Sequence, residues 1–213
     1  MEKFIDRRDA GIALAKRLEE YSQRSKAIIL ALPRGGVPVA YEVAKALSLQ
    51  LDVFIVRKLG VPGHEELAMG AIASGGTVIF NDEIINSLYL SESLIERVIQ
   101  KEQKELERRE KLYRPNLPTL ELKDKTIILI DDGIATGATM HAAVQSIDKQ
   151  KPRHLAVAVP VAACSTYKEF SGRVDNFVCL LNPVNFYAVG LWYDDFNQTT
   201  DEEVTELLIK ANQ

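Results

Sequence analysis

The feature that most constrains the fold is an alternation of short apolar runs with longer segments of helical periodicity. The apolar runs have the length of single strands, and the segments between them place apolar residues three and four positions apart. We expect strands at 27–32, 51–56, 126–130, 155–161 and 174–181. We expect helices at 9–21, 37–47, 137–148, 163–170 and 201–211. This order is typical of βαβ units, so we predict an α/β fold with a five-stranded, mostly parallel sheet flanked by helices.

Two segments depart from this rhythm. Residues 68–73 and 77–80 are short strand-like pieces separated by Ser74, Gly75 and Gly76, which predicts a hairpin. Residues 91–114 carry six acids and seven bases in 24 positions, with Glu105 and Arg109 in the favourable i,i+4 order. We predict one long charged helix there, whose thin apolar stripe over 94–113 is compatible with a homodimer.

The composition excludes several classes of protein. The 213 residues carry a net charge of −4, which argues against a broad nucleic-acid surface. Because no apolar run reaches about eighteen residues, we expect no membrane span. The first residues have no apolar leader, and Cys164 and Cys179 stand alone in apolar stretches, which favours reduced thiols and a cytoplasmic location. We expect a single domain over residues 1–213, large enough to need no disulfide or metal for stability.

The stretch with the clearest chemical meaning is 127–139, IILIDDGIATGAT. An apolar strand leads into Asp131 and Asp132, at the sheet edge where open α/β folds bind ligands. The loop over 135–139 then offers small side chains, backbone N–H groups, two hydroxyls and a helix N-terminus, which suit a phosphate. Because the acids would repel a bare phosphate, we predict a sugar phosphate whose hydroxyls or metal ion meet the carboxylates.

This stretch is very similar to the motif of type I phosphoribosyltransferases that binds 5-phosphoribosyl 1-pyrophosphate (PRPP). The whole pattern resembles the group called predicted phosphoribosyltransferases. The resemblance implies the type I phosphoribosyltransferase fold, carboxylates on the ribose hydroxyls and a loop around the 5′-phosphate. It implies these PRPP-binding residues: Arg34, Gly35, Gly36, Asp131, Asp132, Ala135, Thr136, Gly137, Ala138 and Thr139. It also implies Mg²⁺, held mainly by the substrate, with Asp131 and Asp132 as candidate ligands.

Two further loops follow expected strands. In the first, Gly35 and Gly36 allow backbone conformations that are closed to other residues, and the planar guanidinium of Arg34 can bind an anion. In the family this loop holds pyrophosphate. In the second, Arg57 and Lys58 could simply be solvated cations. The resemblance implies that they clamp pyrophosphate at the base of a mobile lid and, with Asp132, form the catalytic set. Such a lid would close before water could capture the oxocarbenium-like state.

One position departs from part of the family. Hypoxanthine-guanine phosphoribosyltransferases carry an acid, thought to handle the base proton, where this chain has Ala135. Adenine and orotate phosphoribosyltransferases also lack it, so the departure does not exclude activity. The proton acceptor stays open among His64, Glu65 and Glu66.

The segment 182–196 is rich in aromatic residues, with five in fifteen positions, including the only Trp. Such a cluster usually caps a core. In purine phosphoribosyltransferases a similar segment forms a hood over the base, so the resemblance implies a hood within 182–200 and a purine-like acceptor. The implied acceptor-binding residues are Phe186, Val189, Trp192 and Asp194.

The implied function is transfer of a 5-phosphoribosyl group from PRPP to a nitrogenous acceptor, with release of pyrophosphate. One alternative is a catalytically silent regulatory module that senses PRPP, although Arg34, Arg57 and Lys58 are retained and no helix-turn-helix is visible. A second is a sugar-phosphate hydrolase with Asp131 as nucleophile or metal ligand, which would need a further acid cluster.

Overall fold

The computed structural model describes residues 3–115 and 120–213, apart from the side chain of Glu66. The chain forms two compact units. Unit 1 comprises Met1–Val53, Leu122–Gly137 and Lys151–Gln213, and unit 2 comprises Phe54–Glu121 and Ala138–Gln150. The assignment of residues 1–213 to a single domain stays a prediction.

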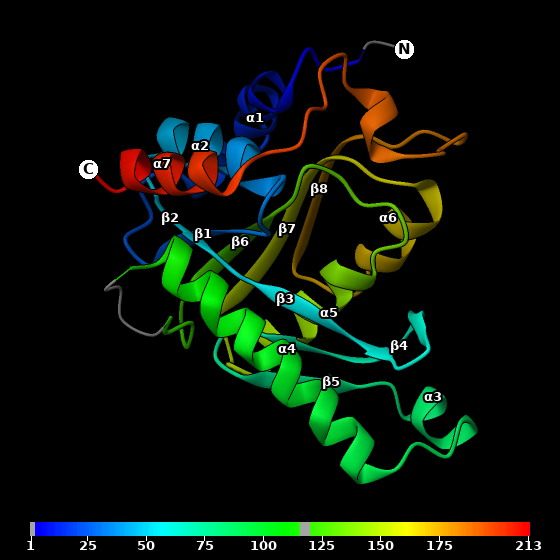
Figure 1. The fold of residues 1–213 in the computed structure, drawn as a ribbon. Helices are drawn as coiled ribbons and strands as arrows, with labels where there is room; N and C mark the ends of the chain where they lie inside the picture. The colour runs from blue at the N-terminus through cyan, green and yellow to red at the C-terminus, as the bar shows by residue number, and fades with distance from the viewer. Residues whose placement is uncertain (1–2, 116–119) are drawn as a thin grey trace. The chain divides into compact units, whose positions relative to one another are not determined.

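Unit 1 is built on the predicted five-stranded sheet (Figure 1). Its strands, in spatial order, are β2 (Gln50–Val53), β1 (Ala27–Ala31), β6 (Thr126–Ile130), β7 (His154–Val161) and β8 (Asn176–Leu181). All neighbouring strands pair in parallel, so the sheet is fully parallel rather than mostly so. The strand expected at 51–56 is wrong at its end: β2 stops at Val53, and Val56 starts a strand of unit 2.

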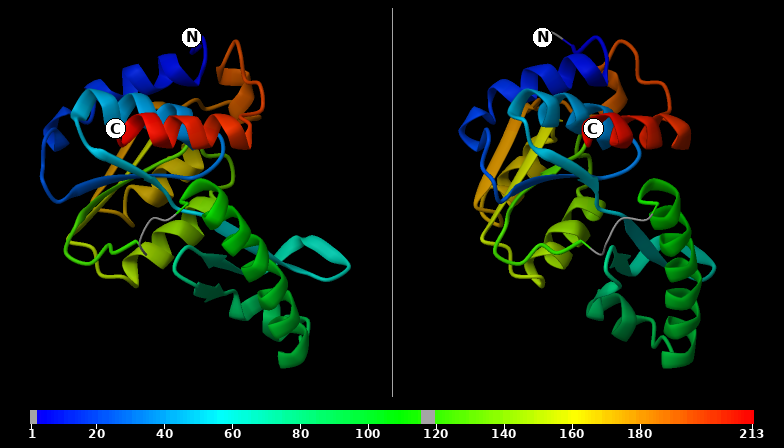
Figure 2. Two further views of the ribbon diagram at one scale, coloured as in Figure 1. Left: turned by 60° about the vertical axis from the view of Figure 1, so that its left-hand side comes forward. Right: turned by 90° about the vertical axis from the view of Figure 1, so that its left-hand side faces the viewer.

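Three helices of unit 1 lie side by side over one face of this sheet (Figure 2). They are α1 (Arg7–Lys16), α2 (Gly36–Leu47) and α7 (Asp201–Ala211); a further helix, α6 (Cys164–Phe170), packs against β8, and short 3₁₀ helices span Glu19–Tyr21 and Val189–Trp192. The helix expected at 9–21 is therefore two elements. The bounds of α7 match the prediction, and the Thr200 side chain accepts a hydrogen bond from the N–H of Glu203 at its start.

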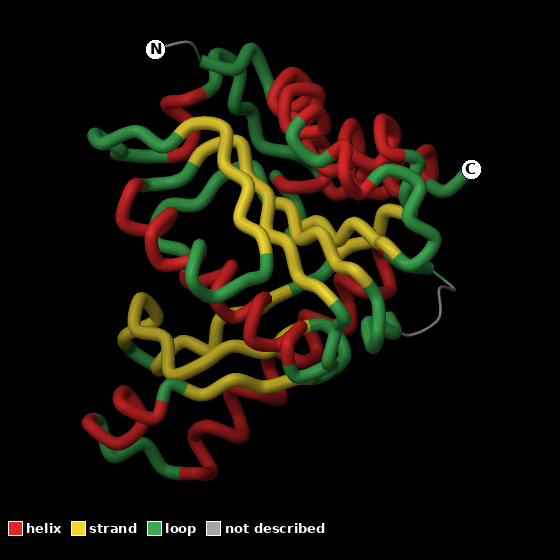
Figure 3. The backbone as a smooth tube through the Cα atoms, turned by 180° about the vertical axis from the view of Figure 1, so that it is seen from behind, coloured by secondary structure: helices red, strands yellow, loops and turns green. Residues whose placement is uncertain are grey.

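Unit 2 contains an antiparallel sheet of three strands (Figure 3). The strands are β3 (Val56–Val61), β4 (His64–Ala73) and β5 (Thr77–Phe80), and the helices are α3 (Asp82–Ser87), α4 (Glu92–Tyr113) and α5 (Ala138–Asp148). The predicted hairpin is confirmed as β4–β5. The expected lid loop is instead mostly strand, because Arg57 and Lys58 pair with Ile72 and Ala71 of β4. Gly60 lies at a bulge of this ladder, and Pro62 and Gly63 form the tight turn between its two strands.

The long charged helix is confirmed as α4. Ser91 caps it by accepting a hydrogen bond from the N–H of Leu94, and Arg109 donates to Glu105 at 2.8 Å as the spacing predicted. The helix packs against β3 and β4, and Leu106 and Tyr113 of its apolar stripe are buried. The stripe therefore has packing partners within unit 2.

Two expectations from composition concern the cysteines and the membrane-spanning helices. Cys164 and Cys179 are both free thiols, and burial raises the pKa of Cys179 to about 12. In residues 3–115 and 120–213, no helix has both the length and the apolarity needed to cross a membrane.

Candidate functional site

Asp131 and Asp132 directly follow β6, at the carboxyl edge of the parallel sheet where the sequence placed them. The N–H of Asp132 donates to Oδ1 of Asp131 at 2.9 Å. Burial raises the pKa of the Asp131 carboxyl well above its usual range, and the neighbouring Asp132 carboxylate adds to that effect. Burial also raises the pKa of Asp132, whereas the guanidinium of Arg7 opposes this rise.

The glycine loop after β1 touches this acid pair. A Cβ built on Gly35 would overlap Oδ2 of Asp132, and a Cβ on Gly36 would lie 2.8 Å from the carbonyl oxygen of Ile130. The peptide bond between Pro33 and Arg34 is cis. Because β1 and β6 are neighbouring parallel strands, their carboxyl ends meet, and only residues without a side chain fit at these two positions.

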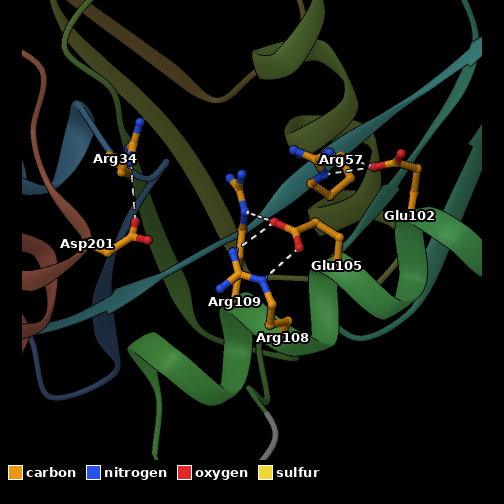
Figure 4. Close-up of polar contacts among 7 residues, drawn as sticks. All are labelled: Arg34, Arg57, Glu102, Glu105, Arg108, Arg109 and Asp201. Atoms are coloured by element: carbon orange, nitrogen blue, oxygen red, sulfur yellow. Dashed lines mark hydrogen bonds and ion pairs between the residues drawn. The ribbon is translucent and has the colours of Figure 1, made fainter.

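Arg34, the cation of this loop, forms an ion pair with the first residue of the last helix. Nη1 of Arg34 lies 3.5 Å from Oδ1 of Asp201, the first residue of α7 (Figure 4). Both side chains are about one-third exposed, at 34% and 33%. A phosphate ligand of Arg34 would therefore meet a guanidinium already facing one carboxylate.

Arg7, at the start of α1, is the site residue that sequence reasoning missed. Its Nε donates to Oδ2 of Asp132 at 2.8 Å, and its Nη1 donates to the carbonyl oxygen of Asn197 at 2.7 Å. The guanidinium carbon lies 3.9 Å from the centre of the Phe196 ring. Nothing in the sequence separates Arg7 from the adjacent Arg8, so no local signal could have identified it.

The predicted phosphate loop is divided between the units. Ala135, Thr136 and Gly137 belong to unit 1, and the hydroxyl of Thr166 donates to the carbonyl oxygen of Ala135 at 2.7 Å. Ala138 and Thr139 are the first residues of α5 in unit 2. Within unit 1 the structure thus brings together Gly35, Gly36 and the two acids. The first three residues of the loop follow Asp132 after two intervening positions.

Arg57 and Lys58 lie on β3 in unit 2 and have different surroundings, because successive side chains of a strand point to opposite faces. Nε and Nη2 of Arg57 donate to Oε2 of Glu102 on α4 at 2.9 and 2.7 Å (Figure 4). Lys58 lines a cavity of about 370 Å³ together with Ala138 and Thr139 of α5. Arg57 is therefore ion-paired with α4, and Lys58 lies beside the start of α5.

The three proton-acceptor candidates lie at the β3–β4 turn. The side chains of His64 and Glu65 are exposed, and that of Glu66 is outside the described residues. Backbone N–H groups of Glu65 itself and of Gly63 lower the pKa of the Glu65 carboxyl. None of these observations assigns a catalytic proton transfer.

The aromatic segment after β8 packs onto unit 1 beside the acids. Phe186, Val189 and Trp192 pack against a buried cluster that includes Phe4 and Tyr193. The Tyr193 hydroxyl donates to the carbonyl oxygen of Asp132.

Two further contacts place the predicted hood. A Cβ on Gly133 would lie 2.6 Å from Cγ1 of Val189, so the segment closely approaches the residue that follows Asp132. Asp194 is exposed, and its N–H donates to the carbonyl oxygen of Phe4 at 2.9 Å. The segment caps part of the core and also borders the acid pair.

This fold and site define the class of the protein. Residues 6–193 match the family model of the phosphoribosyl transferase domain. The chain therefore belongs to the phosphoribosyl transferase domain family, and its fold is that of type I phosphoribosyltransferases.

Particular relatives cover the whole chain. It is 42% identical over 213 residues to two Mycobacterium tuberculosis proteins named "Putative phosphoribosyl transferase MT0597" and "Putative phosphoribosyl transferase Rv0571c". The match takes in 100% of this chain but 48% of each relative, so the chain spans about half the length of these relatives. The crystal structure of the protein TT1426 from Thermus thermophilus is 39% identical, with a TM-score of 0.85 over 98% of both chains.

Proposed function

We propose that this chain transfers a 5-phosphoribosyl group from PRPP to a nitrogenous, purine-like acceptor and releases pyrophosphate. The observation that carries the proposal is the contact of the glycine loop with the Asp131–Asp132 pair at the edge of the parallel sheet. It puts acceptors for sugar hydroxyls next to a backbone loop and a cation suited to phosphate. Membership of the family supports the same reading.

The binding roles follow from the chemistry of each group. Asp131 and Asp132 accept hydrogen bonds from the ribose hydroxyls. The backbone N–H groups and hydroxyls over 135–139 bind the 5′-phosphate. Arg34 and the N–H groups of Gly35 and Gly36 bind the pyrophosphate.

The transfer breaks the bond between the anomeric carbon and the pyrophosphate oxygen, and the electron pair leaves with pyrophosphate. A nitrogen lone pair of the acceptor forms the new bond to that carbon, and the acceptor nitrogen loses its proton to a base. Arg34, Arg57 and Lys58 stabilise the negative charge that develops on the leaving group. For Arg57, this role requires exchange of its Glu102 partner for the phosphate.

Magnesium fits the donors present. Asp131 and Asp132 supply carboxylate oxygens, which Mg²⁺ prefers. Over the described ranges, no group of three or more His, Cys, Asp and Glu side chains could hold a metal by itself. These donors suit an ion held mainly by the phosphates of PRPP, which would neutralise charge on the departing pyrophosphate.

The acceptor site is assigned to Phe186, Val189, Trp192 and Asp194. Rings on this segment offer a face for stacking a planar heterocycle, and the exposed Asp194 carboxylate can accept a hydrogen bond from it. A cytoplasmic location and a homodimer that uses the apolar stripe of α4 stay predictions.

One panel tests the proposal. The protein is mixed with Mg²⁺, PRPP and, in turn, adenine, guanine, hypoxanthine, xanthine, orotate and uracil, and pyrophosphate release is followed. We expect release with at least one base and a higher melting temperature with PRPP. In Asp132→Asn we expect weaker but measurable PRPP binding and a smaller rise in melting temperature. Binding of PRPP without turnover on any base would favour the PRPP-sensing module, and absence of stabilisation by PRPP would contradict both functions.

A further inference from the structure

Arg7 joins three segments of unit 1 that are far apart in the sequence. From the start of α1 it donates to the Asp132 carboxylate after β6 and to the backbone of Asn197, and it lies over the ring of Phe196. Arg7 and Asp132 are separated by 125 positions. Their side chains are only 12% and 14% exposed. Such a shielded, charge-assisted hydrogen bond is stronger than one at the surface.

The adjacent Arg8 provides an internal comparison. Its side chain is 70% exposed, and its Nε lies 3.1 Å from Oε1 of Glu42 on α2. One of two consecutive arginines therefore makes a surface ion pair, and the other reaches the acid of the site. The contact of Arg7 is thus specific to its position and not a property of a basic segment.

The hydrogen bond from Arg7 holds one oxygen of the Asp132 carboxylate, Oδ2. A Cβ on Gly35 would overlap this oxygen, whereas Oδ1 lies 3.3 Å from that position. The N–H of Asp132 donates to Asp131, and its carbonyl oxygen accepts from Tyr193. Arg7 therefore fixes the orientation of the carboxylate through Oδ2.

The charge of Arg7 matters as much as its geometry. Two neighbouring carboxylates, both partly removed from water, repel each other. The Arg7 guanidinium bonds to this pair through Asp132, and the Phe196 ring and the Asn197 carbonyl fix its plane. Removing it would leave the acids uncompensated and Asp132 free to rotate.

We propose that Arg7 is a positioning residue for Asp132, which it holds by Oδ2 so that Oδ1 meets a ribose hydroxyl of PRPP. This inference rests on the proposed function, because it takes PRPP as the ligand of the acid pair. Arg7 itself does not touch the sugar. It acts through the carboxylate.

The first test measures the Kd of PRPP in the presence of Mg²⁺ by titration calorimetry. Arg7→Gln should weaken binding at least about tenfold, the usual value of one charge-assisted hydrogen bond. Arg7→Lys keeps the charge but not the planar fork, and should bind with intermediate affinity. Arg8→Gln is the matched control and should bind like the wild type.

A double-mutant cycle shows whether Arg7 acts through Asp132. In an Asp132→Asn background, Arg7→Gln should change the Kd less than about twofold, because its partner is already altered. An equal loss in both backgrounds would mean that Arg7 contacts PRPP directly, and would overturn the positioning role. Tighter binding by Arg7→Gln would also overturn it, because the guanidinium would then be blocking the site.

Thermal unfolding without PRPP separates a binding defect from a folding defect. If Arg7→Gln does not fold, Phe196→Leu is measured in its place. This variant removes the ring beneath the guanidinium and should weaken PRPP binding about threefold. Unchanged affinity in that variant would then contradict the inference. A wild-type protein that does not bind PRPP would contradict the proposed function, whereas wild-type affinity in the folded Arg7→Gln protein would contradict only the role of Arg7.

Discussion

The parallel sheet of unit 1 and the antiparallel sheet of unit 2 differ in how deeply their strands are buried. Every residue of β1 is buried, as is every residue of β7 after His154, whereas β5 has no buried residue and β3 only Leu59 and Val61. Covered parallel strands form continuous apolar runs, while an antiparallel sheet packed on one face does not need them. The two sheets should therefore respond differently to the same kind of substitution.

The largest expected effect on the free energy of unfolding comes from a substitution in the core of the parallel sheet. Leu129→Ala, at a fully buried position of β6 between Leu30 and Val157, should lower the free energy of unfolding by about 2–5 kcal/mol. Ile79→Ala, on half-buried β5, should cost about 1 kcal/mol. Denaturant unfolding of both variants measures the difference. Equal losses would contradict the contrast between the sheets.

A second comparison uses one glycine from each unit. Gly35→Ala would place a methyl group on the Asp132 carboxylate, cost about 1–3 kcal/mol in unfolding free energy and weaken PRPP binding. Gly76, in the β4–β5 turn, has φ +77° and open space around its Cβ position. Gly76→Ala should cost about 1 kcal/mol from backbone strain alone and leave the Kd of PRPP unchanged. A Gly35→Ala protein with wild-type affinity would show that the close approach is dispensable.

The ion pairs provide a third comparison. Arg57 and Glu102 in unit 2 have side chains 28% and 12% exposed, so their pair is more open to water than the pair of Arg7 with Asp132. Glu102→Gln should lower the free energy of unfolding by about 1 kcal/mol or less. Glu96→Gln, an exposed position on the same helix, serves as the control. If Glu102→Gln instead lowered the free energy of unfolding by several kcal/mol, the Arg57–Glu102 pair would behave as a buried ion pair.

The smallest effect concerns the pH dependence of α4. Hydrogen bonds from Arg108 and Arg109 lower the pKa of Glu105 from 4.5 to about 2. This lowering stabilises the folded protein above pH 4.5, and the contribution is lost as the pH falls towards 2. Since the Glu105 side chain is 29% exposed, the contribution should be below about 1 kcal/mol. The free energy of unfolding is measured from pH 6 to pH 2, and Glu105→Gln should remove this part of its decrease. If the pH profile of the variant is unchanged, groups other than Glu105 cause the decrease.

The sequence prediction succeeded and failed in both units. The strand at 126–130 and the helix at 201–211 were predicted to the residue, because their apolar pattern ends at polar and capping residues. The strand expected at 51–56 was predicted too long, since Phe54 and Ile55 are buried in the connection between β2 and β3 and belong to neither strand. Apolarity alone cannot separate a buried connection from a strand.

The site shows the same limit. The acid pair and the glycine loop could be predicted because each follows its own strand within a few residues. Arg57 and Lys58 were predicted as a pair, but strand geometry gives them different neighbours. Tyr193 was expected only as one of several aromatic residues, and its hydrogen bond to the Asp132 backbone has no local signature.

By itself, the sequence determined most of the strands and helices, the acids after β6 and the glycines after β1, because periodicity and motif chemistry are local properties. Only the tertiary structure decided which cation meets which acid. Arg7 reaches Asp132 across 125 positions, Arg34 faces Asp201, and Arg57 pairs with Glu102. The physical reason is that an ion pair forms where packing of distant elements removes two charges from water together, and spacing along the chain does not encode that event.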